Sequence, residues 1–293
     1  MTESHYAPRA PLQRPPPRKS RGLLGRLGSI GILLAVVLGK AKWLVAGAKF
    51  LKFKTLITMV ASVGAYSLLF GWKFALGFVL LIFVHEMGHA LALHRQGIPA
   101  GAPVFVPFLG AVIAMKGRPR DAWVEAIVGI GGPILGTVGA AVCLVVGIVT
   151  DSMIWYALAS TGFLLNLFNM IPISPLDGGR IAGSISRWFW VVGYAIGVPL
   201  FFKTGSPILA LILLLGLFTI YKLWKAPITG YYDIDPWKRV AMGSAYFLSL
   251  AVMVLGMAAA DAPLEGVVQT TSLASGPAIY TLGNVLGDLR RRS

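Results

Sequence analysis

The sequence predicts an all-α polytopic membrane protein with about six to seven transmembrane helices and one membrane re-entrant segment that resembles a β-hairpin. Two observations lead to this fold class. Hydrophobic residues make up 56% of the 293 residues and charged residues only 13%, whereas soluble domains carry about 25% charged residues. Apolar runs of membrane-spanning length also recur along most of the chain, separated by short polar turns. One helical bundle therefore accounts for nearly the whole sequence.

The apolar runs divide the chain into three expected parts. Residues 1–54 combine a disordered basic tail with an interfacial amphipathic helix, in which lysines alternate with aromatic residues. Residues 55–260 form the transmembrane domain, and residues 261–293 form a C-terminal tail. Spans are expected at 55–71, 72–94, 124–150, 153–171, 188–203, 206–224 and 240–260.

The basic residues predict how these spans are oriented. When the seven spans are threaded alternately, 21 of the 26 lysines and arginines fall on the side of the N-terminus. Because cytoplasmic loops carry an excess of these residues, we expect a multi-pass protein of the cell membrane with a cytoplasmic N-terminus. The net charge of +15 does not indicate nucleic-acid binding, because no soluble basic domain is present to carry it.

The segment of residues 101–117, between two predicted spans, differs from an ordinary loop. It is too short to cross a membrane and is interrupted by Pro103, Pro107 and Gly110, yet it is strongly apolar. Irregular backbone at membrane depth is tolerated where protein surrounds it. We therefore expect it to re-enter the membrane, with a partly embedded loop of no function as the alternative.

The run His85-Glu86-Met87-Gly88-His89 lies in the second predicted span. Residues i and i+4 share one face of a helix, so both histidines can reach one metal ion. Catalytic zinc sites use three protein ligands and leave the fourth position to water. Glu86, next to the first ligand, can take a proton from that water as a general base. The motif therefore predicts a catalytic Zn²⁺ site.

A third ligand can be found by elimination among the remaining histidines and the eleven acidic residues. Most of them lie in tails or connecting loops. Asp177, however, follows an apolar span directly, after Pro172 and Pro175 have broken the helix. This break falls on the side of the membrane where the helix of His85 and His89 ends, so Asp177 is predicted to join the two histidines. Capping of a helix is the alternative role for Asp177.

Two stretches, His85 to His89 and Asn169 to Arg180, resemble the paired motifs HExxH and NxxPxxxLDGGR of the site-2 protease family. The resemblance covers roughly residues 55–194. It implies zinc bound by His85, His89 and Asp177, with Glu86 as the catalytic base. It also implies cleavage within transmembrane segments of other membrane proteins, which makes such a substrate and the lipid bilayer the expected partners. The oligomeric state stays open.

The resemblance suggests substrate-binding residues as well. The family places a re-entrant β-hairpin where residues 101–117 lie, and its edge could pair with an unwound substrate strand. Phe105, Pro107 and Gly110 of this segment are therefore candidate substrate-binding residues. Asn169 is a candidate for orienting or polarising the substrate, with capping of the broken helix as its alternative role.

One position departs from the family pattern. Many members carry Gly-Pro followed by two residues and an asparagine, but here Gly132-Pro133-Ile134-Leu135 is followed by Gly136. The asparagine of that motif therefore has no counterpart at position 136, while the predicted metal ligands are intact.

Two other functions compete with proteolysis. A proteolytically inactive relative could act as a scaffold that binds membrane proteins, but the intact Glu86 argues against it. A transporter or channel would line its pathway with polar intramembrane residues, and the predicted spans offer no convincing acidic site besides Glu86 and Asp177.

Overall fold

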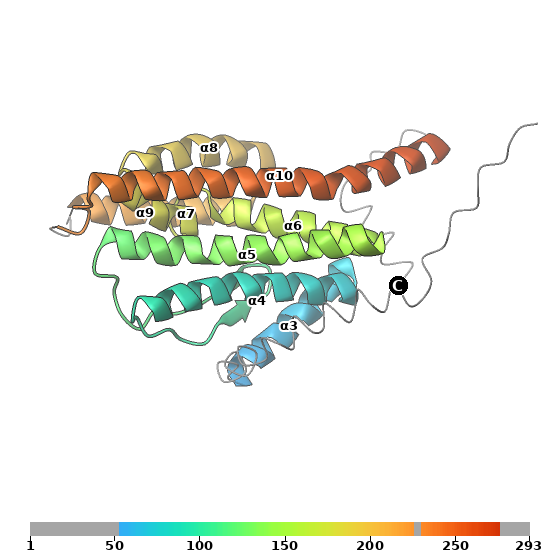
Figure 1. Cartoon of the computed structure of the whole chain (residues 1–293), viewed down its shortest axis with the longest axis horizontal. Helices are drawn as coiled ribbons and strands as arrows, with labels where there is room; N and C mark the ends of the chain where they lie inside the picture. The colour runs from blue at the N-terminus through green and yellow to red at the C-terminus, as the bar shows by residue number, and fades with distance from the viewer. Residues whose placement is uncertain (1–52, 226–229, 276–293) are drawn as a thin grey trace, which may run out of the picture. The chain divides into compact units, whose positions relative to one another are not determined.

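The computed structural model describes residues 53–225 and 230–275. The basic tail and most of the interfacial helix predicted for residues 1–54 lie outside this part. The described chain forms eight α-helices and a two-stranded sheet (Figure 1). In order these are α3 (Phe53–Phe70), α4 (Trp72–Arg95), β1 (Val104–Val106), β2 (Gly110–Val112), α5 (Ala122–Thr150), α6 (Met153–Asn169), α7 (Asp177–Ile185), α8 (Phe189–Thr204), α9 (Pro207–Lys225) and α10 (Pro236–Ser275).

All seven predicted spans coincide with helices, so the helical fold class is confirmed. Among the described residues, three helices are long and apolar enough to cross a membrane, namely α4, α5 and residues Pro236–Glu265 of α10. Large apolar side chains on the helix surfaces are widely exposed, among them Phe202 at 79% and Leu68 at 72%. Surfaces of this kind suit a membrane protein, because lipid can cover them. The count of six to seven transmembrane helices stays a prediction.

Two elements differ from the expected boundaries. Helix α10 continues to Ser275, past the expected end of the transmembrane domain at residue 260. Helix α7 is a short helix that the apolar runs did not predict, and it follows residues 170–176, whose backbone is irregular as Pro172 and Pro175 indicated. Its first residue is acidic, which favours a helix N-terminus. Gly178 and Gly179 let α7 pack directly on the preceding chain, because a Cβ atom at either would overlap the backbone of Met170 or Ser174.

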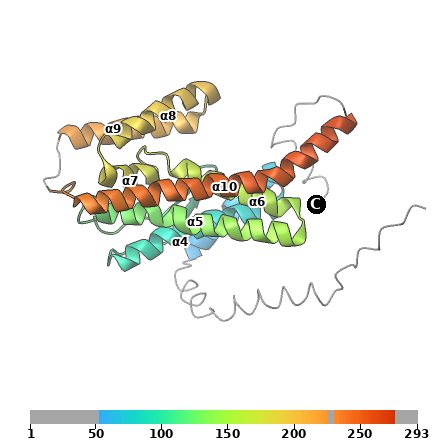
Figure 2. The same cartoon turned by 45° about the horizontal axis from the view of Figure 1, so that its top comes forward.

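Helix α5 is the centre of the packing that positions the site. It lies against α4, α6 and α7, and α10 packs on α6 and α5 (Figures 1 and 2). At the crossing of α4 and α5, a Cβ atom on Gly88 would overlap the carbonyl oxygen of Gly131. The two backbones touch there, as small residues permit between membrane helices. The motif-bearing part of α4 is therefore fixed against α5.

The predicted hairpin-like segment is an antiparallel pair of strands. Val104 pairs with Val112, Phe105 with Ala111 and Val106 with Gly110. Helix α3 holds the pair, because the amide of Phe105 donates to Thr58 Oγ1 at 3.2 Å and that of Phe108 donates to the Tyr66 hydroxyl at 3.1 Å. The hairpin itself is confirmed, whereas its entry into the membrane stays a prediction.

The C-terminal end of α7 is fixed by Arg239 of α10. Its guanidinium donates to the carbonyl oxygens of Ser184 and Ile185, at 3.4 and 3.2 Å, and to that of Tyr232 at 2.7 Å. The last carbonyls of a helix have no partner within the helix. Arg239 supplies one and ties α7 to both α10 and the preceding loop.

Replacing Arg239 by Ala is expected to lower the free energy of unfolding by about 1 to 3 kcal/mol, because half-buried carbonyl groups lose a charged donor. The measurement is thermal melting of the purified protein in detergent. Lys238→Ala is the matched control. Its Nζ pairs with Asp235 on the surface at 2.6 Å and lies 5.6 Å from the ring centroid of the neighbouring Trp237, and such surface contacts contribute little. Equal melting temperatures for the two variants would contradict this role of Arg239.

Candidate metal centre

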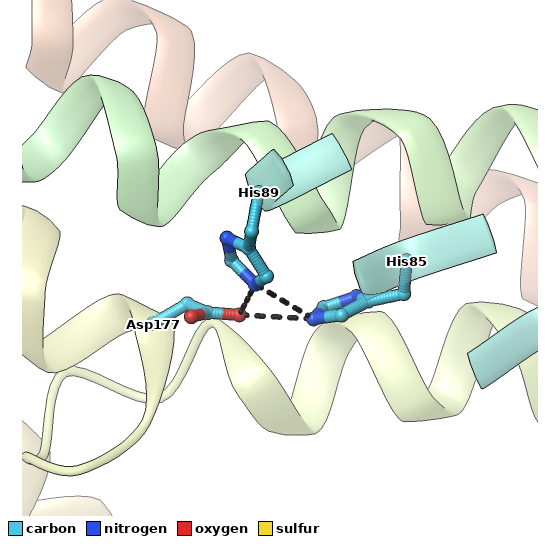
Figure 3. Close-up of side chains that lie close together, drawn as sticks. All are labelled: His85, His89 and Asp177. Carbon is cyan, nitrogen blue, oxygen red and sulfur yellow. Dashed lines mark hydrogen bonds and ion pairs between the residues drawn. The ribbon is translucent and has the colours of Figure 1, made fainter. Parts of the chain in front are cut away.

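Three side chains converge inside the helical bundle: His85 and His89 of α4, and Asp177 at the start of α7 (Figure 3). The Nε2 atoms of the two histidines are 3.1 Å apart. Asp177 Oδ2 lies 3.1 Å from Nε2 of His85 and 3.2 Å from Nε2 of His89. The three residues are only 4 to 7% exposed. The structure therefore brings together the two predicted ligands of one helix and a third predicted ligand from a segment 88 residues further along the chain than His89.

The partners of the two imidazoles determine which nitrogen faces the centre. Nδ1 of His89 lies 2.8 Å from the carbonyl oxygen of Val128. Nδ1 of His85 lies 2.8 Å from Oδ1 of Asn166, whose Nδ2 donates to the carbonyl oxygen of Gly162 at 2.7 Å. Carbonyl oxygens only accept hydrogen bonds. We therefore assign the ring proton to Nδ1 in both histidines, which leaves both Nε2 lone pairs directed at the centre.

This arrangement fits a bound cation. Two imidazole lone pairs and one carboxylate oxygen face one another at 3.1 to 3.2 Å, and such atoms repel unless a positive charge lies among them. Zinc binds imidazole nitrogen and carboxylate oxygen at about 2.0 to 2.2 Å, so tetrahedral ligands lie about 3.3 Å apart. The residue types and their spacing therefore suit a tetrahedral metal ion with three protein ligands.

Glu86 is buried beside the ligands, with 6% of its surface exposed. At 3.6 residues per turn it points about 100° from His85 and about 60° from His89 around α4, within the same half of the helix. No hydrogen bond joins its carboxylate to another residue in the described ranges 53–225 and 230–275. A buried carboxylate with free acceptor positions beside a metal centre can take a proton from water.

The other predicted site residues lie elsewhere. Nδ2 of Asn169 donates to the carbonyl oxygen of Leu165 in its own helix, at 3.0 Å. Phe105 is only 2% exposed and stacks on Phe83, so its side chain packs in the core. Pro107 and Gly110 lie half-buried at the hairpin turn. Within the described residues no interaction connects these four with the three ligands, and their part in substrate binding stays a prediction.

Two residues that contact the histidines, Asn166 and Gly132, were not predicted from the sequence. Asn166, 1% exposed, holds His85, and its signal was a second asparagine in an apolar run, one turn before Asn169. Gly132 of α5 lies directly against the ring of His89, because a Cβ atom there would overlap the imidazole. A glycine before a proline gives no hint of such a contact.

Comparisons with known proteins agree with the motif. Residues 73–153 match the model of Peptidase family M50, a range that holds His85, Glu86 and His89 but ends before Asp177. A zinc metalloprotease of Methanocaldococcus jannaschii is 32% identical over 151 residues, covering 49% of this chain and 43% of that protein. Rip3 of Mycobacterium tuberculosis, named as a candidate zinc metalloprotease, is 28% identical over 150 residues, covering 46% and 37%.

A plant relative extends the comparison. The chloroplast protein EGY2 of Arabidopsis thaliana, also named as a candidate zinc metalloprotease, is 29% identical over 155 residues, which cover 38% of this chain and 28% of EGY2. The chain thus matches less than half the length of each of these relatives.

Proposed function

We propose, from the confirmed resemblance to the site-2 proteases of Peptidase family M50, that this membrane protein is an intramembrane zinc metalloprotease. Its reaction would be hydrolysis of peptide bonds within transmembrane segments of other membrane proteins. The observation that carries the proposal is the meeting of His85 Nε2, His89 Nε2 and Asp177 Oδ2 at 3.1 to 3.2 Å within apolar helices. The relatives named as zinc metalloproteases support zinc as the metal.

In this proposal each group has one task. His85, His89 and Asp177 hold the zinc ion, which when bound polarises a carbonyl group and makes water more acidic. Glu86 accepts a proton from the attacking water while the water oxygen bonds to the scissile carbonyl carbon. Glu86 then delivers this proton to the amide nitrogen as the carbon–nitrogen bond breaks. The water is thus divided between the new carboxyl group and the new amine.

The site's place in the chain supports a cut near one membrane surface. The two histidine ligands lie in the second half of α4, which ends at Arg95, and by the distribution of basic residues that end faces the cytoplasm. The proposed orientation is a cell-membrane protein with a cytoplasmic N-terminus that cuts its substrate near the cytoplasmic end. The β1–β2 hairpin offers strand edges on which an unwound substrate segment could be held extended.

Replacing Asp177 by Ala is expected to weaken zinc binding at least 10- to 100-fold, because one of three protein ligands is lost. Metal analysis of the purified wild-type protein should give about one zinc per chain. Asp233→Ala is the control, since Asp233 is exposed in the loop before α10 and should leave the zinc content unchanged. Zinc content that is the same in wild type and Asp177→Ala would refute the ligand assignment.

The proteolytic activity itself is tested by comparative proteomics of membranes from cells that lack the protein and from cells that make it. A substrate should accumulate uncut in the first cells and appear shortened, with a new end inside a transmembrane segment, in the second. If no membrane protein changes its length between the two, the proposal of intramembrane proteolysis fails.

A further inference from the structure

We infer that Asn166 is a positioning residue for His85, and that Gly136 of α5 provides the space in which the Asn166 carboxamide lies. This inference rests on the proposed metal centre and deepens it. It assigns a function to a buried polar side chain in an apolar span, where an unpaired carboxamide would be costly.

The contacts of Asn166 give it one orientation. Its Nδ2 donates to the carbonyl oxygen of Gly162, one turn earlier in α6, at 2.7 Å. This bond fixes which end of the carboxamide is the oxygen, and that Oδ1 accepts from Nδ1 of His85 at 2.8 Å. At 1% exposure the carboxamide is shielded from bulk water. Asn166 thereby keeps the ring proton of His85 on Nδ1 and directs Nε2 toward the centre.

The two histidine ligands are oriented by different means. His89 donates from Nδ1 to a main-chain carbonyl, that of Val128 in α5, which no side-chain substitution removes. His85 depends on a side chain from α6. Partners of this kind orient metal ligands, and their loss commonly costs 10- to 100-fold in metal affinity. Asn166 should therefore be the member of this outer layer most sensitive to mutation.

Gly136 is complementary to Asn166. A Cβ atom built on Gly136 would overlap Oδ1 and lie only 2.8 Å from Nδ2 of Asn166, so any larger residue at 136 displaces the carboxamide. Because this Cβ position is so close to Oδ1, which lies 2.8 Å from Nδ1 of His85, the carboxamide of an asparagine at 136 could reach the same imidazole nitrogen. Gly136 is also the position at which the sequence departs from the Gly-Pro motif. The geometry points to an exchange of side chains between the two helices. Here α6 supplies the carboxamide at position 166 and α5 supplies the space at position 136, whereas the motif has the asparagine in α5.

The first experiment measures Co²⁺ affinity of the full-length purified protein from the visible absorption of bound Co²⁺, with thermal melting of the metal-free protein as a check of folding. Asn166→Ala and Asn166→Leu should weaken Co²⁺ binding 10- to 100-fold. Asn166→Asp keeps an acceptor for Nδ1 and should bind within a few-fold of wild type. Asn169→Ala is the matched control, because within the described chain the Asn169 amide hydrogen-bonds only to its own helix, and the Co²⁺ affinity of this variant should be unchanged.

The outcomes separate this inference from the proposed function. If wild type binds no Co²⁺, the proposed metal centre fails and the inference with it. If wild type binds and Asn166→Leu binds equally well, only the positioning role is overturned. If Asn166→Leu does not fold, the other two variants decide: the positioning role is overturned if Asn166→Ala and Asn166→Asp weaken Co²⁺ binding equally.

The second experiment tests the exchange. Asn166→Gly alone should lose Co²⁺ affinity, and the double variant Gly136→Asn with Asn166→Gly should recover at least tenfold of that loss, because the carboxamide returns from the opposite helix. A double variant that binds no better than Asn166→Gly would overturn the exchange while leaving the positioning role of Asn166 intact.

Discussion

Replacing Glu86 by Gln is expected to leave the zinc content unchanged and to lower cleavage of a membrane substrate by about 10²- to 10⁴-fold, the range that a general base contributes. Glutamine has nearly the shape of glutamate but cannot accept the proton of water. Glu86 lies in the helix of His85 and His89 and makes no hydrogen bond to other residues of the described chain, so the substitution breaks no hydrogen bond there.

The measurement is cleavage of a substrate found by the membrane comparison, co-expressed with each variant, together with metal analysis of the purified proteins. Glu125→Gln is the matched control. Glu125 accepts a hydrogen bond from the Tyr231 hydroxyl at 2.7 Å, away from the ligands, and a glutamine can accept it too. Cleavage that survives in Glu86→Gln would show that Glu86 is not the base. If Glu86→Gln and Glu125→Gln cleave the substrate equally, a different group must accept the proton of water.

The two histidines could be paired from sequence because their partnership is local. Spacing of four residues places side chains on one face of any helix, and the apolar run around them identifies a helix of membrane length. The same reasoning by apolar runs located all seven longer helices, although α10 continues 15 residues past its expected end at residue 260. Asp177 required one further step, since the alternation of spans returns the chain to the side on which α4 ends.

What the sequence could not supply are contacts between helices at single-residue precision. Periodicity does not tell which face of α5 meets α4, so Gly132 against His89 and Gly136 against Asn166 were invisible. Likewise, two prolines indicated irregular chain before Asp177, while the short helix α7 depends on two glycines that let it pack on the backbone of Met170 and Ser174. These features arise from tertiary packing, which overrides local propensity.

Gly132 shows how strongly such a contact can act on the metal centre. A Cβ atom at this position would overlap Nε2, Cε1 and Cδ2 of His89. The imidazole cannot turn away freely, because its Nδ1 is hydrogen-bonded to the carbonyl oxygen of Val128, which lies in α5 like Gly132. Neighbouring Gly131 touches α4 as well, its own Cβ position lying 2.9 Å from Cβ of Ala92. Neither the ring nor the helix backbone has space to yield.

Gly132→Ala is therefore expected to displace Nε2 of His89 and to weaken zinc binding by more than tenfold. Overpacking should also lower the free energy of unfolding by about 1 to 3 kcal/mol. Gly132→Val should lose binding altogether. Gly64→Ala is the control, since no atom lies within 4 Å of a Cβ atom there in α3, and alanine favours a helix. Metal titration and thermal melting measure both effects. If Gly132→Ala binds zinc like Gly64→Ala, the close contact between α5 and the imidazole does not constrain the ligand. A loss of zinc without a loss of melting temperature would mean that the cost falls on the orientation of His89 alone.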